Sequence, residues 1–252
     1  MEPAPVYSFV KHVQPYECGP GATLPGHALT GIIQTAASSH ADRLGSGMND
    51  LAQRGYFWAL SVLHIEIDRM PEQNMEVDVS TWPSAFNRLR VGREFIGQLP
   101  DNEVLFRASS EWIVVDATKR RAVDPRFLAE LYEPRKQFAL SFPIKRLKPA
   151  RIPDNAGSQA SFRVCRSSLD INAHVNNTEY IRVSLDALYD AGIHGNLASL
   201  WVTFHNESFF NDVIDLFITR QETNGEHVQV TGLCREKPIF CAQCSFRSVP
   251  TS

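Results

Sequence analysis

The feature that most limits how this chain can fold is a long amphipathic helix followed directly by strands. Between His27 and Leu44 apolar side chains recur every three or four residues, the spacing of one helix face, and Pro25 stands where a helix can begin. A helix with one apolar stripe must bury that stripe, and consecutive antiparallel strands offer the surface to do so. We therefore expect a sheet that wraps the helix. Its strand-like segments are 6–13, 57–67, 75–82, 89–99 and 104–115.

The second half of the chain repeats this plan. Helical spacing from Asn177 to Tyr189 follows a short strand, and four more strand-like segments come next. These strands are 162–165, 200–210, 213–219, 227–234 and 239–246. Residues of the two halves also match at one constant offset: Ile65, Asn74, Val77 and Val79 against Val202, Asn211, Ile214 and Leu216. Since the identity is weak, duplicated architecture remains a hypothesis.

Two helix-wrapped antiparallel sheets in tandem predict an α+β fold of the double hot-dog type, whose apolar tunnels between helix and sheet suit acyl chains. Between the halves, residues 118–158 hold five prolines and no firm periodicity. An irregular stretch of that length would be unusual inside a compact domain. We therefore predict an N-terminal half at 1–117, a connection at 118–158 and a C-terminal half at 159–252.

The composition argues against several classes of protein. With 25 basic and 28 acidic residues the net charge is -3, so nothing draws the whole molecule to nucleic acid or to an anionic membrane. No apolar stretch reaches the ~18 residues of a transmembrane helix. The segment Met1–Pro5 lacks the basic flank and apolar core of a secretory signal. We expect a soluble cytoplasmic protein with no integral membrane segment.

Polar side chains gather just before the second helix. Asp170, Asn172 and His174 alternate with apolar residues, and alternate side chains of an extended backbone share a face. With Glu207 further along the chain, they supply a base, an orienting acid and an amide donor. Those are the groups needed to attack an activated carbonyl.

The alternative interpretation of this cluster is a helix cap. Asn176 followed by Glu179 fits a capping box, in which short polar side chains bond the first free amides of a helix. Capping explains Asn176, but it needs neither Asp170 nor His174, and this surplus of ionisable groups favours chemistry. The residues alone leave both interpretations open.

The five cysteines favour reduced, structural thiols. An odd count without a secretory signal argues against a disulfide framework. Cys241 and Cys244 form a Cys-x-x-Cys pair with Cys234 nearby, yet positions three apart on a strand face opposite sides of a sheet. No histidine or second pair completes a tetrahedral metal site. We expect no metal or organic cofactor.

Six motifs, in order along both halves, carry a family resemblance. The most specific is 169–180, Leu-Asp-Ile-Asn-Ala-His-Val-Asn-Asn-Thr-Glu-Tyr. The others are 34–37 (Gln-Thr-Ala-Ala), 65–71 (Ile-Glu-Ile-Asp-Arg-Met-Pro), 80–83 (Ser-Thr-Trp-Pro), 108–112 (Ala-Ser-Ser-Glu-Trp) and 204–208 (Phe-His-Asn-Glu-Ser). From about Val6 to Phe246 the chain resembles the acyl-acyl carrier protein thioesterases, including their bacterial members.

The resemblance implies hydrolysis of the thioester between a fatty acyl chain and acyl carrier protein. It implies the catalytic set Asp170, Asn172, His174 and Glu207. We expect His174 and Glu207 to hold or activate water, Asp170 to orient them, and the amide of Asn172 to position or polarise the carbonyl. Direct attack by a carboxylate stays open. Ser208 stands where many plant relatives carry cysteine, so a cysteine nucleophile is not expected.

Two further sets of residues are candidates for substrate contacts. The N-terminal half should enclose the acyl tail, and its candidate lining residues are Met48, Leu51, Phe57 and Trp58. Basic residues could dock an acidic carrier protein or form ordinary solvated surface: Arg88, Arg90, Arg93, Lys119, Arg120, Arg121, Lys145, Arg146 and Lys148. His205 lies two residues before Glu207 and would share its strand face.

Two rival functions remain. A hot-dog hydratase, which adds water to an enoyl thioester, also pairs an aspartate with a histidine near a helix start, but Asn172 and Glu207 suit hydrolysis better. A non-catalytic acyl- or lipid-binding module is the other rival, since Met70 stands where the repeat would place Glu207. Chain-length preference, carrier protein against coenzyme A, and the oligomeric state, a homodimer included, are left open.

Overall fold

The computed structural model describes residues 4–153, 156–221 and 227–247. The chain divides into two compact units, Met1–Ile144 and Lys145–Ser252. Each unit packs helix against an antiparallel sheet. Among the helices of the described residues, none has the length and apolar character needed to cross a membrane.

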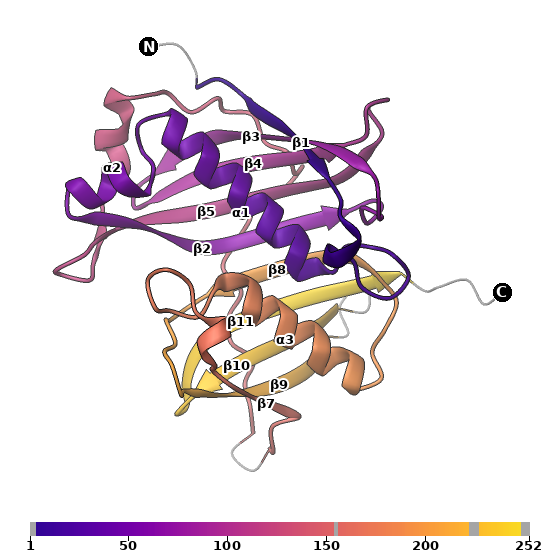
Figure 1. Cartoon of the computed structure of the whole chain (residues 1–252). Coiled ribbons are helices and arrows are strands. Elements are labelled where there is room, and N and C mark those ends of the chain that lie inside the picture. The colour runs from indigo at the N-terminus through magenta and orange to yellow at the C-terminus, as the bar shows by residue number, and fades with distance from the viewer. Residues whose placement is uncertain (1–3, 154–155, 222–226, 248–252) are drawn as a thin grey trace. The chain divides into compact units, whose positions relative to one another are not determined.

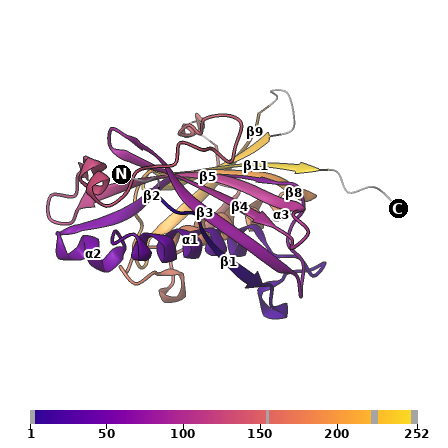
Figure 2. The same cartoon turned by 90° about the horizontal axis from the view of Figure 1, so that it is seen from above.

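The first unit wraps one sheet around one long helix. Its elements are β1 (Tyr7–His12), α1 (Gly26–Arg43), α2 (Met48–Gln53), β2 (Tyr56–Ile67), β3 (Glu76–Asn87), β4 (Arg90–Gln98), β5 (Val104–Asp116) and β6 (Ala122–Val123). The strands pair antiparallel in the order β1-β3-β4-β5-β2, and β6 adds to β5. The long helix α1 lies across one face of this sheet (Figure 1), and the edge-on view shows α2 on the same face (Figure 2). Leu29, Ile33 and Ala36 are the apolar stripe that α1 buries.

The second unit has the same plan with fewer additions. Its elements are β7 (Ala160–Arg163), α3 (Asn177–Asp190), β8 (Asn196–Phe204), β9 (Val213–Gln221), β10 (His227–Cys234) and β11 (Lys237–Arg247). The strands pair antiparallel in the order β8-β11-β10-β9-β7. Tyr180, Ile181 and Leu188 are buried on the face that α3 turns to the sheet. Both units confirm the predicted α+β arrangement.

The capping prediction for α3 is right for one residue and wrong for the other. The Asn176 Oδ1 accepts from the backbone N–H of Thr178 at 3.1 Å, so Asn176 caps the helix. Glu179 does not close a capping box, because its carboxylate pairs with Arg182 at 2.9 Å. The backbone N–H of Asn176 is satisfied instead by the C=O of Ser168 at 2.9 Å.

The strand boundaries support the hypothesis of duplication. Strands β2 and β8 end at Ile67 and Phe204, and β3 and β9 begin at Glu76 and Val213, which is the offset found in the sequence. The turns between them place Asn74 and Asn211 in the left-handed region, with φ of 66° and 68°. Asparagine tolerates that backbone better than most residues. The prediction that one strand runs over 200–210 was wrong, since β8 ends at Phe204.

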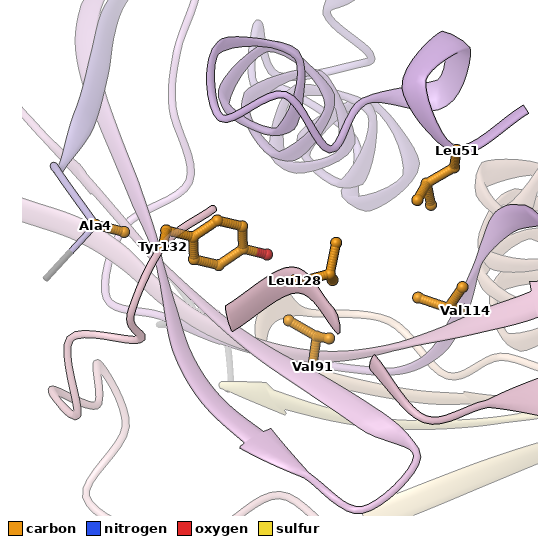
Figure 3. Close-up of a cluster of buried hydrophobic side chains, with 6 residues drawn as sticks. All are labelled: Ala4, Leu51, Val91, Val114, Leu128 and Tyr132. Atoms are coloured by element: carbon orange, nitrogen blue, oxygen red, sulfur yellow. The ribbon is translucent and has the colours of Figure 1, made fainter. Parts of the chain in front are cut away.

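The first part of the predicted connection belongs to the first unit. Residues 118–144 lie within that unit and include β6 and a 3₁₀ helix at Pro125–Glu130. Leu128 and Tyr132 are buried in an apolar cluster with Leu51 and Val91 (Figure 3). The segment lacks periodicity because single side chains such as Leu128 and Tyr132 fix it to the first unit, and it has no continuous apolar face.

The remainder of the predicted connection runs along the second unit. The N–H of Leu147 donates to the Thr203 Oγ1 at 2.8 Å, and the Gln229 side chain donates to the C=O of Lys148 at 2.8 Å. An irregular segment can lie against a domain when its backbone polar groups find such partners. The structure thus divides the chain after Ile144 and leaves no independent linker among the described residues of 118–158.

The anchoring of the first segment predicts a large stability difference between two neighbouring leucines. Leu128 is fully buried, so Leu128→Ala should lower the free energy of unfolding by about 2–5 kcal/mol. Leu131 is exposed, and Leu131→Ala should cost about 0.5 kcal/mol or less. Denaturant titration of both variants measures the difference, and equal losses would contradict the packing of this segment.

Candidate active site

The motif before α3 forms a tight turn. Leu169 and Val175 form an isolated antiparallel bridge, and the N–H of Asp170 donates to the C=O of His174 at 2.7 Å. Ala173 closes the turn with φ of 60°. The predicted extended backbone was therefore wrong, and alternation along a strand does not explain how these side chains meet.

Asp170 holds this turn through its carboxylate. One oxygen, Oδ1, accepts from the backbone N–H of Asn172 at 2.8 Å and from that of His174 at 3.1 Å. Charge-assisted bonds of this kind are stronger than bonds between neutral groups. Asp170 thus fixes the peptide that carries His174, and it does so through the backbone of the turn.

Glu207 lies in the loop that follows β8. Two backbone N–H groups at the start of the loop, those of His205 and Asn206, donate to the C=O of Ile239 at 2.8 and 3.1 Å. Further along the loop, the C=O of Ser208 accepts from the N–H of Val175 at 3.1 Å. This last bond ties the Glu207 loop to the turn before α3.

His174 and Glu207 meet across the two loops. The Nδ1 of His174 lies 3.4 Å from the Oε1 of Glu207, and the two side chains are 23% and 35% exposed. Glu207 therefore faces one ring nitrogen, so the other, Nε2, is the nitrogen left to act on a substrate or a water molecule. Glu207 and His174 are distant in the sequence but in direct contact in the fold.

Asn172 stands apart from this pair. It is exposed, and the hydrogen bond it makes with another described residue comes from its backbone N–H to Asp170. The structure therefore brings together Asp170, His174 and Glu207 of the predicted set. The carboxamide of Asn172 contacts none of the three.

Three neighbours of the pair were missed or misplaced by the sequence interpretation. Phe209 packs edge-on to the His174 ring, with 5.1 Å between ring centroids. Tyr180 is buried against Phe240, and burial raises the pKa of its hydroxyl to about 12. His205 pairs with Arg146 at 3.1 Å, and burial together with the charge of Arg146 lowers the pKa of its imidazole.

The four candidate tail-binding residues lie in different surroundings. Leu51 is buried in the apolar cluster of Figure 3, and Trp58 packs against that cluster. The indole N–H of Trp58 donates to the C=O of Ser46 at 2.8 Å. Phe57 lies under the guanidinium of Arg120, and Met48 is largely exposed.

One of the candidate docking residues is buried, which corrects that prediction. Arg93 is 5% exposed and contacts the Nδ1 of His40 at 3.0 Å, and burial lowers the pKa of its guanidinium to about 10. Burial, with the charge of Arg93, lowers the pKa of His40 to about 4. Arg90 is half-buried and paired with Glu111 at 2.6 Å. The other candidates are exposed: Arg88, Lys119, Arg120, Arg121, Lys145, Arg146 and Lys148.

The thiols of the second unit are packed away from solvent. Cys234, Cys241 and Cys244 are buried, and burial raises the pKa of Cys241 to about 11 and of Cys244 to about 12. A thiolate is the form that attacks an electrophile or binds a metal, and a raised pKa disfavours it. Within the described ranges, no group of three or more His, Cys, Asp and Glu side chains is arranged to hold a metal ion.

Two domain families cover most of the chain. Residues 7–133 match the acyl-ACP thioesterase N-terminal domain, and residues 152–236 match the acyl-ACP thioesterase C-terminal domain. The chain belongs to the acyl-ACP thioesterase family. This confirms the resemblance drawn from the six motifs.

Plant proteins are among the similar relatives. An oleoyl-acyl carrier protein thioesterase of Coriandrum sativum is 27% identical over 220 residues, covering 81% of this chain and 59% of that protein. A palmitoyl-acyl carrier protein thioesterase of Gossypium hirsutum is 26% identical over 242 residues, covering 90% and 58%. Both are chloroplastic. The chain thus spans about three fifths of the length of these relatives.

Solved structures share the fold. An acyl-ACP thioesterase from Bacteroides thetaiotaomicron matches with a TM-score of 0.79 at 23% identity, covering 96% of this chain and 98% of that chain. A 12:0-ACP thioesterase from Umbellularia californica matches with a TM-score of 0.82 at 20% identity, covering 96% and 97%. These likenesses confirm the predicted double hot-dog fold.

The turn predicts different amide protection in two variants of Asp170. Asp170→Ala removes the acceptor of two backbone hydrogen bonds, each with a net value of about 1.5–3 kcal/mol when the acceptor is charged. The amides of Asn172 and His174 should then exchange with solvent faster, whereas Asp170→Asn keeps an acceptor oxygen and should stay closer to the native protein. Amide hydrogen exchange measures this, with Asp186→Ala on the exposed face of α3 as control. Equal exchange in all variants would rule out the capping role of Asp170.

The buried thiols predict an order of chemical labelling. In the folded protein, a disulfide reagent at pH 8 should modify the exposed Cys165 first, while Cys234, Cys241 and Cys244 should react only after unfolding. Because Cys241 and Cys244 have raised pKa values, a change from pH 7 to pH 9 should leave both protonated and unreactive. Mass spectrometry of the labelled peptides reads the order. Early modification of Cys244 would contradict its burial.

Proposed function

We propose that the chain hydrolyses fatty acyl-acyl carrier protein thioesters to a free fatty acid and the carrier thiol. The observation that carries this proposal is the approach of His174 Nδ1 to Glu207 Oε1 over 3.4 Å. It joins an imidazole from the most specific family motif to a carboxylate from another. The names of the plant relatives support acyl-carrier thioesters as the substrate class.

In this mechanism His174 is the general base. The carboxylate of Glu207 accepts a hydrogen bond from Nδ1–H, which keeps the proton on Nδ1 and leaves the lone pair of Nε2 to remove a proton from water. The adjacent carboxylate stabilises the imidazolium formed during attack, which then gives its proton to the carrier thiolate that leaves as the C–S bond breaks. General-base assistance of this kind accelerates a reaction by about 10²–10⁴-fold.

Asp170 and Asn172 act on geometry and on the developing charge. Asp170 holds the His174 peptide in the turn, so it acts as a positioning residue. The carboxamide of Asn172 is exposed beside this turn and can donate to the thioester oxygen when substrate binds. One donor aimed at such an oxyanion contributes about 10²–10³-fold. We therefore retain the proposed role of Asn172, whose carboxamide donates a hydrogen bond to the thioester oxygen once substrate is bound.

Different residues bind the acyl tail and the carrier in this proposal. The first unit encloses the acyl tail with its apolar cluster, of which Leu51 and Trp58 are candidate lining residues. The carrier is recognised by the exposed basic residues of the predicted docking set. Arg93 is not among them, because it is buried.

The decisive experiment combines a substrate series with matched carboxylate variants. Saturated acyl-carrier thioesters of increasing chain length, with coenzyme A esters alongside, should release free thiol. Glu207→Gln removes the acceptor charge beside His174 and should lower kcat by about 10²-fold or more. Glu236→Gln makes the same change at an exposed carboxylate of the second unit and should leave kcat unchanged.

Each rival function gives a different result in the same assay. A hydratase would consume the absorbance of an enoyl thioester without releasing thiol. A binding module would bind the acyl carrier and release nothing. Native turnover in Glu207→Gln would refute the assigned chemistry even if the protein proved to be a thioesterase.

A further inference from the structure

The imidazole of His174 has a carboxylate and an aromatic ring as side-chain neighbours. The Oε1 of Glu207 lies 3.4 Å from its Nδ1. Phe209 meets it with 5.1 Å between centroids and an interplanar angle of 88°, an edge arrangement. Aromatic pairs favour this geometry because the positive edge of one ring meets the negative face of the other.

Hydrogen bonds hold the turn that carries Phe209. The N–H of Phe209 donates to the Asp212 Oδ2 at 2.9 Å, and the N–H of Asp212 returns to the C=O of Phe209 at 3.0 Å. The same turn is also attached to Val164, the residue after β7: the N–H of Asn211 donates to the C=O of Val164 at 3.1 Å. Phe209 therefore projects from a closed, anchored turn.

Burial alone does not explain this placement. The Phe209 residue is 50% exposed, although a phenylalanine that served only the core would be covered. Its neighbour Phe210 is 57% exposed and makes no ring contact with His174 or with any other residue in the described part of the chain. The two phenylalanines thus differ in one respect that matters, the contact with the imidazole.

We propose that Phe209 is a positioning residue that fixes the plane of the His174 ring so that Nε2 points in one direction. This inference rests on the proposed role of His174 as general base. The contact at Nδ1 restrains the ring at one atom, while the side chain can still turn about its Cα–Cβ and Cβ–Cγ bonds. The edge contact with Phe209 restrains the ring at a second place and keeps Nδ1 facing Glu207. A base held in one orientation loses less entropy on reaching the transition state.

The test compares Phe209→Leu with Phe210→Leu on acyl-carrier substrate. Loss of the edge contact should lower kcat about threefold to tenfold, the range that the value of an aromatic pair allows, with KM changed by less than about twofold. Phe209→Tyr keeps the aromatic edge and should retain native kcat. Phe210→Leu removes an equally exposed ring and should leave both constants unchanged.

A spectroscopic readout separates positioning from loss of fold. Nitrogen-15 spectra of the His174 imidazole should show one dominant tautomer, with the proton on Nδ1, in the native protein and in Phe209→Tyr. Phe209→Leu should show both tautomers, with an unchanged melting temperature. An unchanged tautomer together with unchanged kcat would overturn the inference, and so would an effect on KM alone, which would indicate a substrate contact.

The two proposals fail in different ways. If the native protein released no thiol from any substrate, the proposed hydrolysis would fail, while the tautomer spectra would still report whether Phe209 orders the ring. If the native protein were active and Phe209→Leu matched Phe210→Leu in every readout, only the positioning role would fail.

Discussion

The site depends on one backbone hydrogen bond between two loops that are distant in sequence. The N–H of Val175 donates to the C=O of Ser208, and each of these residues directly follows a member of the His174–Glu207 pair. The main chain therefore sets the spacing of the two side chains before either of them makes a contact. The entropy of bringing an imidazole and a carboxylate together is lost during folding, so it does not have to be lost at each turnover.

The sequence predicts most of the fold because apolar periodicity records which face of each element is buried. The helix beginning near His27 and the strands after it follow from that pattern alone. Periodicity fails where a segment is held by isolated anchors, as at Leu128 and Tyr132 in the predicted connection. It also fails at the end of β8, because the exposed pair Phe209 and Phe210 extends the predicted strand past Phe204. The constant offset between the halves carried the missing information, since it places that end opposite Ile67.

The sequence predicted which residues form the site better than it predicted how they are arranged. The surplus of ionisable groups identified Asp170 and His174, but an Asx-type turn at Asp170 replaced the expected extended backbone. Residue type alone misjudged Arg93, because a basic residue on a strand is usually solvated and this one faces His40 inside the first unit. Phe209 gave no signal at all, because nothing in the sequence separates it from Phe210, and only the structure shows that it contacts His174.

The first unit makes the same backbone bond without the same chemistry. There the N–H of Leu24 donates to the C=O of Pro71 at 2.8 Å, and α1 begins two residues after the donor, as α3 does in the second unit. The side chains that precede these two bonded residues are Thr23 and Met70, in the places of the histidine and the glutamate. Neither a hydroxyl nor a thioether takes a proton from water near neutral pH. The duplicated fold therefore sets the same main-chain spacing twice, and the identity of two side chains decides that the proposed chemistry belongs to the second unit alone.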